Sequence, residues 1–195
     1  MKFIKYLSAL LLCTAASGCM NLTLGDSEIA GRVLDDATGK PIPDAIVHVV
    51  WEGNIHGIVQ GSTVCYHVEA VVTDVDGKFT IPSWRRAAVG GERRIADTQR
   101  IFDIYKEGYG NFGPGPHLDR QGDTKIKRTE GSAEDQLFFS GRYYMFGCGS
   151  EDGSANNPTL QVLNNRMCAE RNRISKQIGK ALEMCTKITP PPLTK

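Results

Sequence analysis

Short apolar runs recur between about residues 28 and 105, and in several of them apolar and polar residues alternate with a period of two. The runs 28–34, 45–51, 65–73, 78–82 and 101–105 are short and rich in β-branched and aromatic residues, with turn residues between them. Side chains of a strand point alternately to the two faces of its sheet, so this period is typical of strands with one buried face. Repeated short strands separated by turns predict an antiparallel β-sandwich.

The run at residues 65–73 predicts a clear division between two faces. One face carries Tyr66, Val68, Ala70 and Val72, and the other carries Cys65, His67 and Glu69. We expect the first face to be buried and the second to lie in water. The following residues, Asp74-Val75-Asp76-Gly77, predict a tight turn, because Asp tolerates and Gly favours the positive φ angles of hairpin turns.

The period changes to that of a helix beyond the loop-like stretch at residues 111–131. A start at Ser132 that resembles a capping box precedes apolar residues at helical spacing, which predicts a helix over 133–146. A second predicted helix, over 159–187, ends before three consecutive prolines. Its apolar side consists of Leu160, Leu163, Met167, Ile174, Ile178 and Leu182. We therefore expect an α+β fold in which a C-terminal helical hairpin over 126–188 lies on the sandwich, with a Pro-rich tail over 189–195.

The N-terminus has the layout of a secretory signal. Lys2 and Lys5 precede a mostly apolar run from Tyr6 to Ala16, and small residues follow that run. This order predicts a signal peptide over residues 1–18, and the apolar run is too short to span a bilayer comfortably. Secretion without a lipid, after cleavage at a nearby site, is the alternative interpretation of the same residues.

The end of this segment, Ala16-Ser17-Gly18-Cys19, resembles the lipobox of bacterial lipoproteins, in which the lipidated cysteine becomes the first mature residue. The resemblance implies that Cys19 is acylated, that a linker follows over 19–27, and that the lipid anchors the chain in a membrane. Met20 rather than Asp follows the cysteine. In enterobacterial-type envelopes this implies sorting to the outer membrane, on the side that faces the periplasm.

If the chain is exported, its remaining cysteines are expected to form disulfides. Four cysteines are then left for two disulfides in an oxidising compartment: Cys65, Cys148, Cys168 and Cys185. Cys168 and Cys185 lie on one predicted helix, about 25 Å apart at 1.5 Å per residue, and this distance prevents their pairing. We expect Cys148 to pair with Cys168 across the helical hairpin, which leaves Cys65 to pair with Cys185.

Two turn motifs and the distance between them resemble a known domain. The residues are Gly31-Arg32-Val33, Thr38-Gly39-Lys40-Pro41-Ile42, Asp44-Ala45-Ile46-Val47, the stretch from Thr73 to Phe79, Ile81-Pro82 and Gly108-Tyr109. Together they resemble the carboxypeptidase regulatory-like domain, a transthyretin-like β-sandwich, which implies this fold for residues 28–125. The resemblance implies no peptidase activity, because this domain accompanies zinc carboxypeptidases without supplying their catalysis. The chain departs from the pattern between Pro82 and Ile101, where a longer and more basic insertion stands.

No motif in the sequence commits the chain to a reaction. The four histidines are scattered, none has the spacing of a zinc peptidase, and no nucleophile has an evident base. We therefore predict no catalytic residue, no metal and no cofactor. Cys65, His67 and Glu69 share a predicted strand face that can hold a soft metal, although a half-cystine beside two solvated polar residues explains the same pattern.

Charge narrows the choice of partner. Without Lys2 and Lys5 the 23 basic residues become 21, against 22 acidic residues, and this balance gives no reason to expect nucleic acid. The densest basic segment holds Arg85, Arg86, Arg93, Arg94 and Arg100, with Trp84 beside them. Such a segment favours binding to anionic lipid headgroups, lipopolysaccharide phosphates or an acidic protein. A solvated loop, partly neutralised by Glu92 and Asp97, is the alternative.

These patterns predict a non-catalytic cell-envelope lipoprotein. It contacts the membrane through its N-terminal lipid, and its sandwich has a structural role or binds an envelope protein. A second hypothesis is a module that binds envelope glycans through aromatic residues near Trp51, Trp84 and Tyr109. A third is a hydrolase of unrecognised type, whose site no linear motif reveals.

Overall fold

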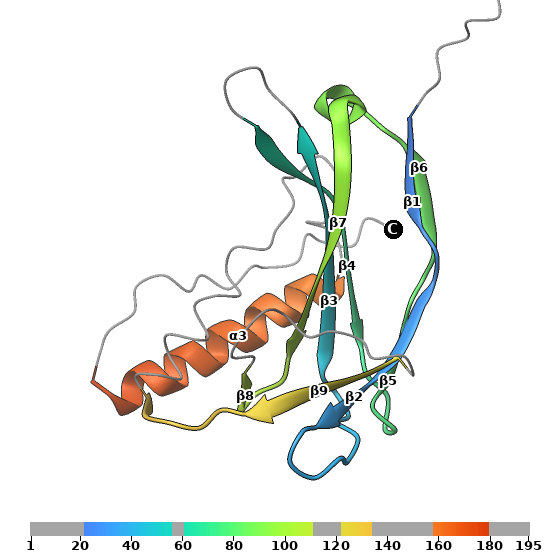
Figure 1. Ribbon diagram of the computed structural model, residues 1–195. Helices are drawn as coiled ribbons and strands as arrows, with labels where there is room; N and C mark the ends of the chain where they lie inside the picture. Colours follow the sequence, from blue (N-terminus) through green and yellow to red (C-terminus); the bar gives the residue numbers. More distant parts are fainter. Residues whose placement is uncertain (1–21, 56–60, 111–121, 134–157, 180–195) are drawn as a thin grey trace, which may run out of the picture.

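The computed structural model describes residues 22–55, 61–110, 122–133 and 158–179. They form two β layers with one α-helix on the outside of the second layer (Figure 1). In chain order the elements are β1 (Thr23–Asp26), β2 (Ile29–Asp35), β3 (Ile46–Ile55), β4 (Ser62–Val72), β5 (Lys78–Ile81), β6 (Trp84–Ala87), the 3-10 helix η1 (Gly90–Arg94), β7 (Ile95–Tyr105), β8 (Tyr109–Gly110), β9 (Asp123–Arg128) and α3 (Pro158–Gln177). The predicted signal peptide over 1–18, Cys19, Cys148, Cys185 and the tail over 189–195 lie outside the described residues.

The first layer is built on a long antiparallel ladder. β1 pairs with β6 and β2 pairs with β5, so that Thr23 lies opposite Ala87 at one end and Arg32 lies opposite Lys78 at the other. The ladder is interrupted between β5 and β6, where Pro82 has no N–H to donate. β9 and β8 extend this layer beyond β2.

The pairing of β9 with β2 departs from the antiparallel arrangement that the sequence predicted. These two strands run parallel, with Val33 opposite Thr124, whereas the other pairs among the described strands are antiparallel. The reason is the path of the chain after β7, which crosses from the second layer into the first within residues 106–108. In the first layer β8 and β9 form a short antiparallel pair. β9 therefore runs opposite to β8, and it lies beside β2 in the same direction as β2.

The second layer has the strand order β4-β3-β7 and is covered on both faces. Val47, Val49 and Trp51 of β3 pack between the two layers, whereas Ile46 and Val50 pack on the opposite face, against residues of α3. A strand that is buried on both faces reads as a nearly continuous apolar run. This explains why residues 45–51 show little alternation in the sequence.

Tyr66, Val68 and Ala70 of β4 are buried as predicted, whereas Val72 is exposed and Cys65, His67 and Glu69 are half-buried rather than wet. A β-bulge also changes which side chains share a face. Trp51 pairs with His67 and Glu52 pairs with Cys65, so Tyr66 is the extra residue. Tyr66 therefore packs between the layers in the cluster that contains Trp51, as His67 also does. Cys65 instead packs with Val50 and Val68 on the face that α3 covers.

One α-helix, α3, lies across the outer face of the second layer (Figure 1). Its Leu163 and Met167 pack on Ile46, Ala70 and Tyr105 of the sheet. Apart from Ala133, the described α-helical residues all belong to α3, so they do not show the predicted hairpin. Ala133 is the first residue of the helix expected over 133–146, and the other residues of that range lie outside the described ones. No helix in the described ranges is long and apolar enough to cross a membrane.

The helix also ends earlier than the predicted boundary at residue 187. α3 stops at Gln177, and Gly179 follows in the left-handed region with φ 67°. The N–H of Gly179 donates to the carbonyl of Lys176. Glycine in this conformation is a common helix terminator, because its lack of a Cβ removes the steric cost of a positive φ.

The turn predicted at residues 74–77 is confirmed. Gly77 has φ 72°, and the carboxylate of Asp74 accepts hydrogen bonds from the N–H groups of Asp76 and Lys78 at 2.9 and 2.8 Å. A Cβ at Gly77 would lie 2.6 Å from the carbonyl oxygen of Val33. Both the conformation and the close approach of β2 therefore require glycine at this position.

A buried carboxylate at the end of β2 joins three parts of the first layer. Asp35 accepts hydrogen bonds from the N–H and hydroxyl of Thr38 at 2.9 and 3.0 Å, and from the hydroxyl of Tyr109 at 2.8 Å. The guanidinium of Arg128 lies 3.3 Å from the same carboxylate. The bond from Tyr109, followed by those from Thr38, holds the pKa of Asp35 well below its usual range. Asp35 thus holds β8, β9 and the loop after β2 together.

We predict that Asp35→Asn lowers stability at neutral pH and flattens its dependence on acid. The pKa of Asp35 is lower in the folded chain than in the unfolded chain, so the ionised carboxylate stabilises the fold above about pH 4 and this contribution is lost as pH falls further. Urea midpoints measured at several pH values test this. Asp36→Asn, which changes the exposed neighbour, is the control, and equal acid sensitivity of all three proteins would contradict the prediction.

Candidate functional site

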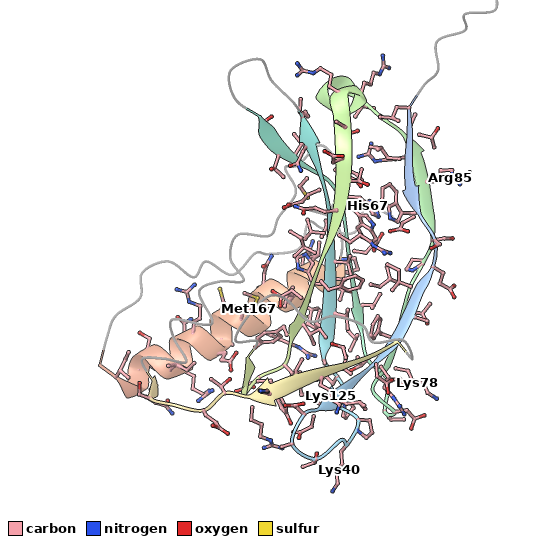
Figure 2. The ribbon with its side chains drawn as sticks, viewed as in Figure 1. Lys40, His67, Lys78, Arg85, Lys125 and Met167 are labelled. Atoms are coloured by element: carbon pink, nitrogen blue, oxygen red, sulfur yellow. The ribbon has the colours of Figure 1, made fainter. Side chains whose placement is uncertain are left out.

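The alternation of β6 divides the predicted partner-binding residues between two faces. Trp84 and Arg86 point into the sandwich and are half-buried, whereas Arg85 and Ala87 are exposed. Figure 2 shows Arg85 on the outer side of the first layer. The basic segment that reads as one patch in the sequence is therefore not one surface in the structure.

Trp84 belongs to an aromatic cluster between the two layers. Its ring centroid lies 3.8 Å from that of His67 and 5.4 Å from that of Trp51, which it meets edge to face. The Nε2 atom of His67 lies 3.3 Å from a carboxylate oxygen of Glu69, and burial raises the pKa of Glu69. Edge-to-face and offset contacts of this kind stabilise aromatic pairs beyond their burial.

Asp26 links this cluster to both layers. The indole Nε1 of Trp51 donates a hydrogen bond to Asp26 Oδ2 at 2.8 Å, and the guanidinium of Arg100 lies 3.2 Å from the same oxygen. Asp26 is in β1, Trp51 is in β3 and Arg100 is in β7. One half-buried carboxylate therefore ties the first layer to two strands of the second.

Arg86 has a structural role. Its guanidinium forms two bonds of 2.7 Å with the carboxylate of Glu92, one from each terminal nitrogen, and it also donates to the carbonyl groups of Tyr66 and Ala87. The bond from Arg86 holds the pKa of Glu92 below its usual value. This pair fastens η1, which contains Glu92, to β6 and β4.

Arg93 and Arg94 stay exposed at the end of the sandwich where β1 begins. Both lie on η1, which begins directly after the exposed residue Val89. Leu22 lies beside this segment, because its carbonyl accepts a hydrogen bond from the N–H of Ala88 at 2.8 Å. We call the surface formed by Leu22, Val89, Arg93 and Arg94 the basic end. Arg93 and Arg94 are exposed there, as Arg85 is on the outer side of the first layer, and Arg93 also donates from Nε to the carbonyl of Ala88 at 3.4 Å.

The hypothesis of a soft-metal site at Cys65, His67 and Glu69 is wrong. Cys65 is disulfide-bonded, and the bulge turns it to the opposite face of β4 from His67 and Glu69. No group of three or more potential metal ligands occurs among the described residues. Cys168 is also disulfide-bonded, and the predicted pairings with Cys148 and Cys185 remain predictions because those two partners lie outside the described residues.

A charged cavity of about 490 Å³, which the sequence did not predict, lies between α3 and the end of β7. Its lining includes Asp44, Tyr105, Lys106, Glu107, Arg166, Glu170 and Arg173. Arg166 binds both carboxylate oxygens of Asp44 at 2.9 and 3.0 Å, and Arg173 lies 3.3 Å from Glu107. These pairs fasten α3 to the sandwich. They join residues more than sixty positions apart, so no local pattern could reveal them.

The surroundings of Tyr105, the tyrosine in this cavity, keep its hydroxyl protonated. Burial, followed by the charge of Glu170, raises the pKa of Tyr105 far above its usual value. Glu170 in turn accepts a hydrogen bond from the N–H of Gly108 at 3.1 Å. The polar groups around the cavity thus bind one another and hold structural elements together. A second cavity, of about 640 Å³, is lined by Asp36, Ala37, Lys127, Arg128 and Glu130.

The aromatic residues of the glycan hypothesis contribute little exposed surface. Trp51 is 2% exposed, and Trp84 is half-buried against it. The hydroxyl of Tyr109 binds Asp35, and the guanidinium of Arg128 lies 5.3 Å from the centre of its ring. A sugar needs an open aromatic face to stack on, so the described arrangement does not favour this hypothesis.

Comparisons of this chain with protein-family models, with characterised proteins and with solved structures found no match.

We predict that Arg86→Ala destabilises the fold and that Arg85→Ala does not. Loss of Arg86 leaves the partly buried carboxylate of Glu92 and the carbonyl of Tyr66 without this donor, which should lower the free energy of unfolding by about 2 kcal/mol. Arg85 is exposed on the same strand, and its loss should change stability by less than about 0.5 kcal/mol. Urea denaturation of the two variants checks this, and similar losses in both would contradict the assignment.

Proposed function

We propose that this chain is a non-catalytic lipoprotein of the cell envelope whose transthyretin-like β-sandwich acts as a protein-binding module. Acylated Cys19 anchors it in the outer membrane on the periplasmic side. The signal-like segment and the lipobox-like residues 16–19 support the anchor. The disulfide bonds of Cys65 and Cys168 support export, because disulfides persist in oxidising compartments.

The exposed stretch at residues 96–100 of β7 is the observation that carries the binding role. Among the described strands β7 pairs with β3 alone, although it is eleven residues long. Residues 96–100 of β7 are all exposed. An exposed edge offers a row of backbone donors and acceptors, and an extended segment of a partner can add to it as a further strand.

The roles of the charged groups fit a module of this kind. Asp26, Asp35 and Arg166 each join elements that are distant in the chain, and Arg86 joins β6 to β4 through the carbonyl of Tyr66. These residues give the sandwich a rigid frame and keep the β7 edge in one geometry. A preorganised edge loses less conformational freedom when it binds a partner than a loop does.

We predict that a photoreactive side chain at Gln99 crosslinks to an envelope protein in intact cells. Gln99 is exposed on β7, and p-benzoylphenylalanine at this position would touch any strand added to that edge. The control is the same photoreactive residue at Val75, which is 83% exposed in the turn after β4. A discrete adduct from position 99 and none from position 75 is the expected result. Adducts of equal yield from both positions, or from neither, would count against binding at the β7 edge.

A further inference from the structure

The sandwich begins at the basic end. The carbonyl of Leu22 already accepts a hydrogen bond from Ala88, and β1 starts at the next residue. Figure 1 shows β1 starting at the same end of the molecule as η1, where Arg93 and Arg94 are exposed. Leu22 and Val89 are 39% and 52% exposed there. Two cations and two apolar side chains therefore share the end from which the chain leaves toward its N-terminus.

The reach of the chain fixes how far this end can lie from a lipid on Cys19. Leu22 is three positions after Cys19, and a fully extended chain spans roughly 10 Å over three positions. If Cys19 is acylated, as the proposed function has it, the basic end must stay next to the membrane surface. This step rests on the proposed function, whereas the composition of the basic end does not.

The charges of the basic end are not balanced by acids. Among the described residues neither Arg93 nor Arg94 takes part in an ion pair, and the nearest acid in the chain, Glu92, is held by Arg86. At the opposite end Lys78 pairs with Asp76 and Lys127 pairs with Asp36. Lys40 and Lys125 are exposed there, and among the described residues they form no ion pair, so they match the two arginines in charge and exposure. Figure 2 shows Lys40, Lys78 and Lys125 at that end, away from η1.

We propose that the basic end lies on the surface of an anionic membrane and orients the sandwich there. Arg93 and Arg94 bind lipid phosphates, because a guanidinium donates two parallel hydrogen bonds to phosphate oxygens. Leu22 and Val89 enter the interfacial region beside them, where apolar side chains gain from leaving water. The opposite end, with Lys40 and Lys125, then faces away from the membrane, and β7 stays accessible to a partner.

The test uses the chain from residue 19 to 195 with Cys19→Ser, so that no acyl chain contributes. The protein is sedimented with vesicles of phosphatidylglycerol and phosphatidylcholine in equal parts, and with vesicles of phosphatidylcholine alone. The double variant R93A/R94A removes the two arginines of the basic end. The matched control K40A/K125A removes two exposed lysines at the opposite end. Circular dichroism verifies that all three proteins are folded.

We expect the parent chain to bind the anionic vesicles and not the neutral ones, with binding that weakens as salt is added. The variant R93A/R94A should lose affinity about 30-fold, which corresponds to ~1 kcal/mol for each arginine, whereas K40A/K125A should stay close to the parent. No binding to anionic vesicles, or equal losses in both variants, would overturn the proposal. Because this chain carries no lipid, the result is independent of acylation, which the mass of the native N-terminus reports separately.

Discussion

The bond between the indole of Trp51 and the carboxylate of Asp26 is the contact on which the rest of this sandwich depends. Asp26 also binds Arg100, so one carboxylate holds β1 against β3 and β7. Trp51 in turn contacts the rings of His67 and Trp84. A buried indole N–H without its acceptor costs free energy, and the layers at this end keep their spacing because Asp26 supplies that acceptor. The basic end and the start of β7 are built on this frame.

Much of the β architecture could be predicted from the sequence, because alternation and turn chemistry are local. The strands near residues 29, 46, 66 and 79 and the turn that ends at Gly77 follow from such signals. The bulge at Tyr66 does not, because it is set by the pairing with β3. The parallel pair β2 and β9 and the end of α3 at Gly179 likewise depend on the path of the chain and on one backbone conformation.

The candidate site shows the same limit. The sequence singled out the basic segment, but it could not separate Arg86, which binds Glu92 inside the fold, from Arg93 and Arg94, which stay exposed. The distinction arises because side chains of β6 alternate between its two faces, which turns Arg86 inward, and because the pair of Arg86 with Glu92 holds η1 against β6. The resulting arrangement has two exposed arginines and two exposed apolar residues at one end, and an exposed stretch of β7 at residues 96–100. These features fit a domain held close to a membrane with one strand open to partners.

The most direct test of the account is the intact mass of the protein purified from its native membrane, measured before and after reduction. The account predicts an N-terminal Cys19 that carries acyl chains, and an increase of about four protons on reduction because two disulfides open. An unmodified N-terminus together with free cysteines would contradict it, since a chain that keeps its signal-like segment and its thiols has neither been exported nor anchored as proposed.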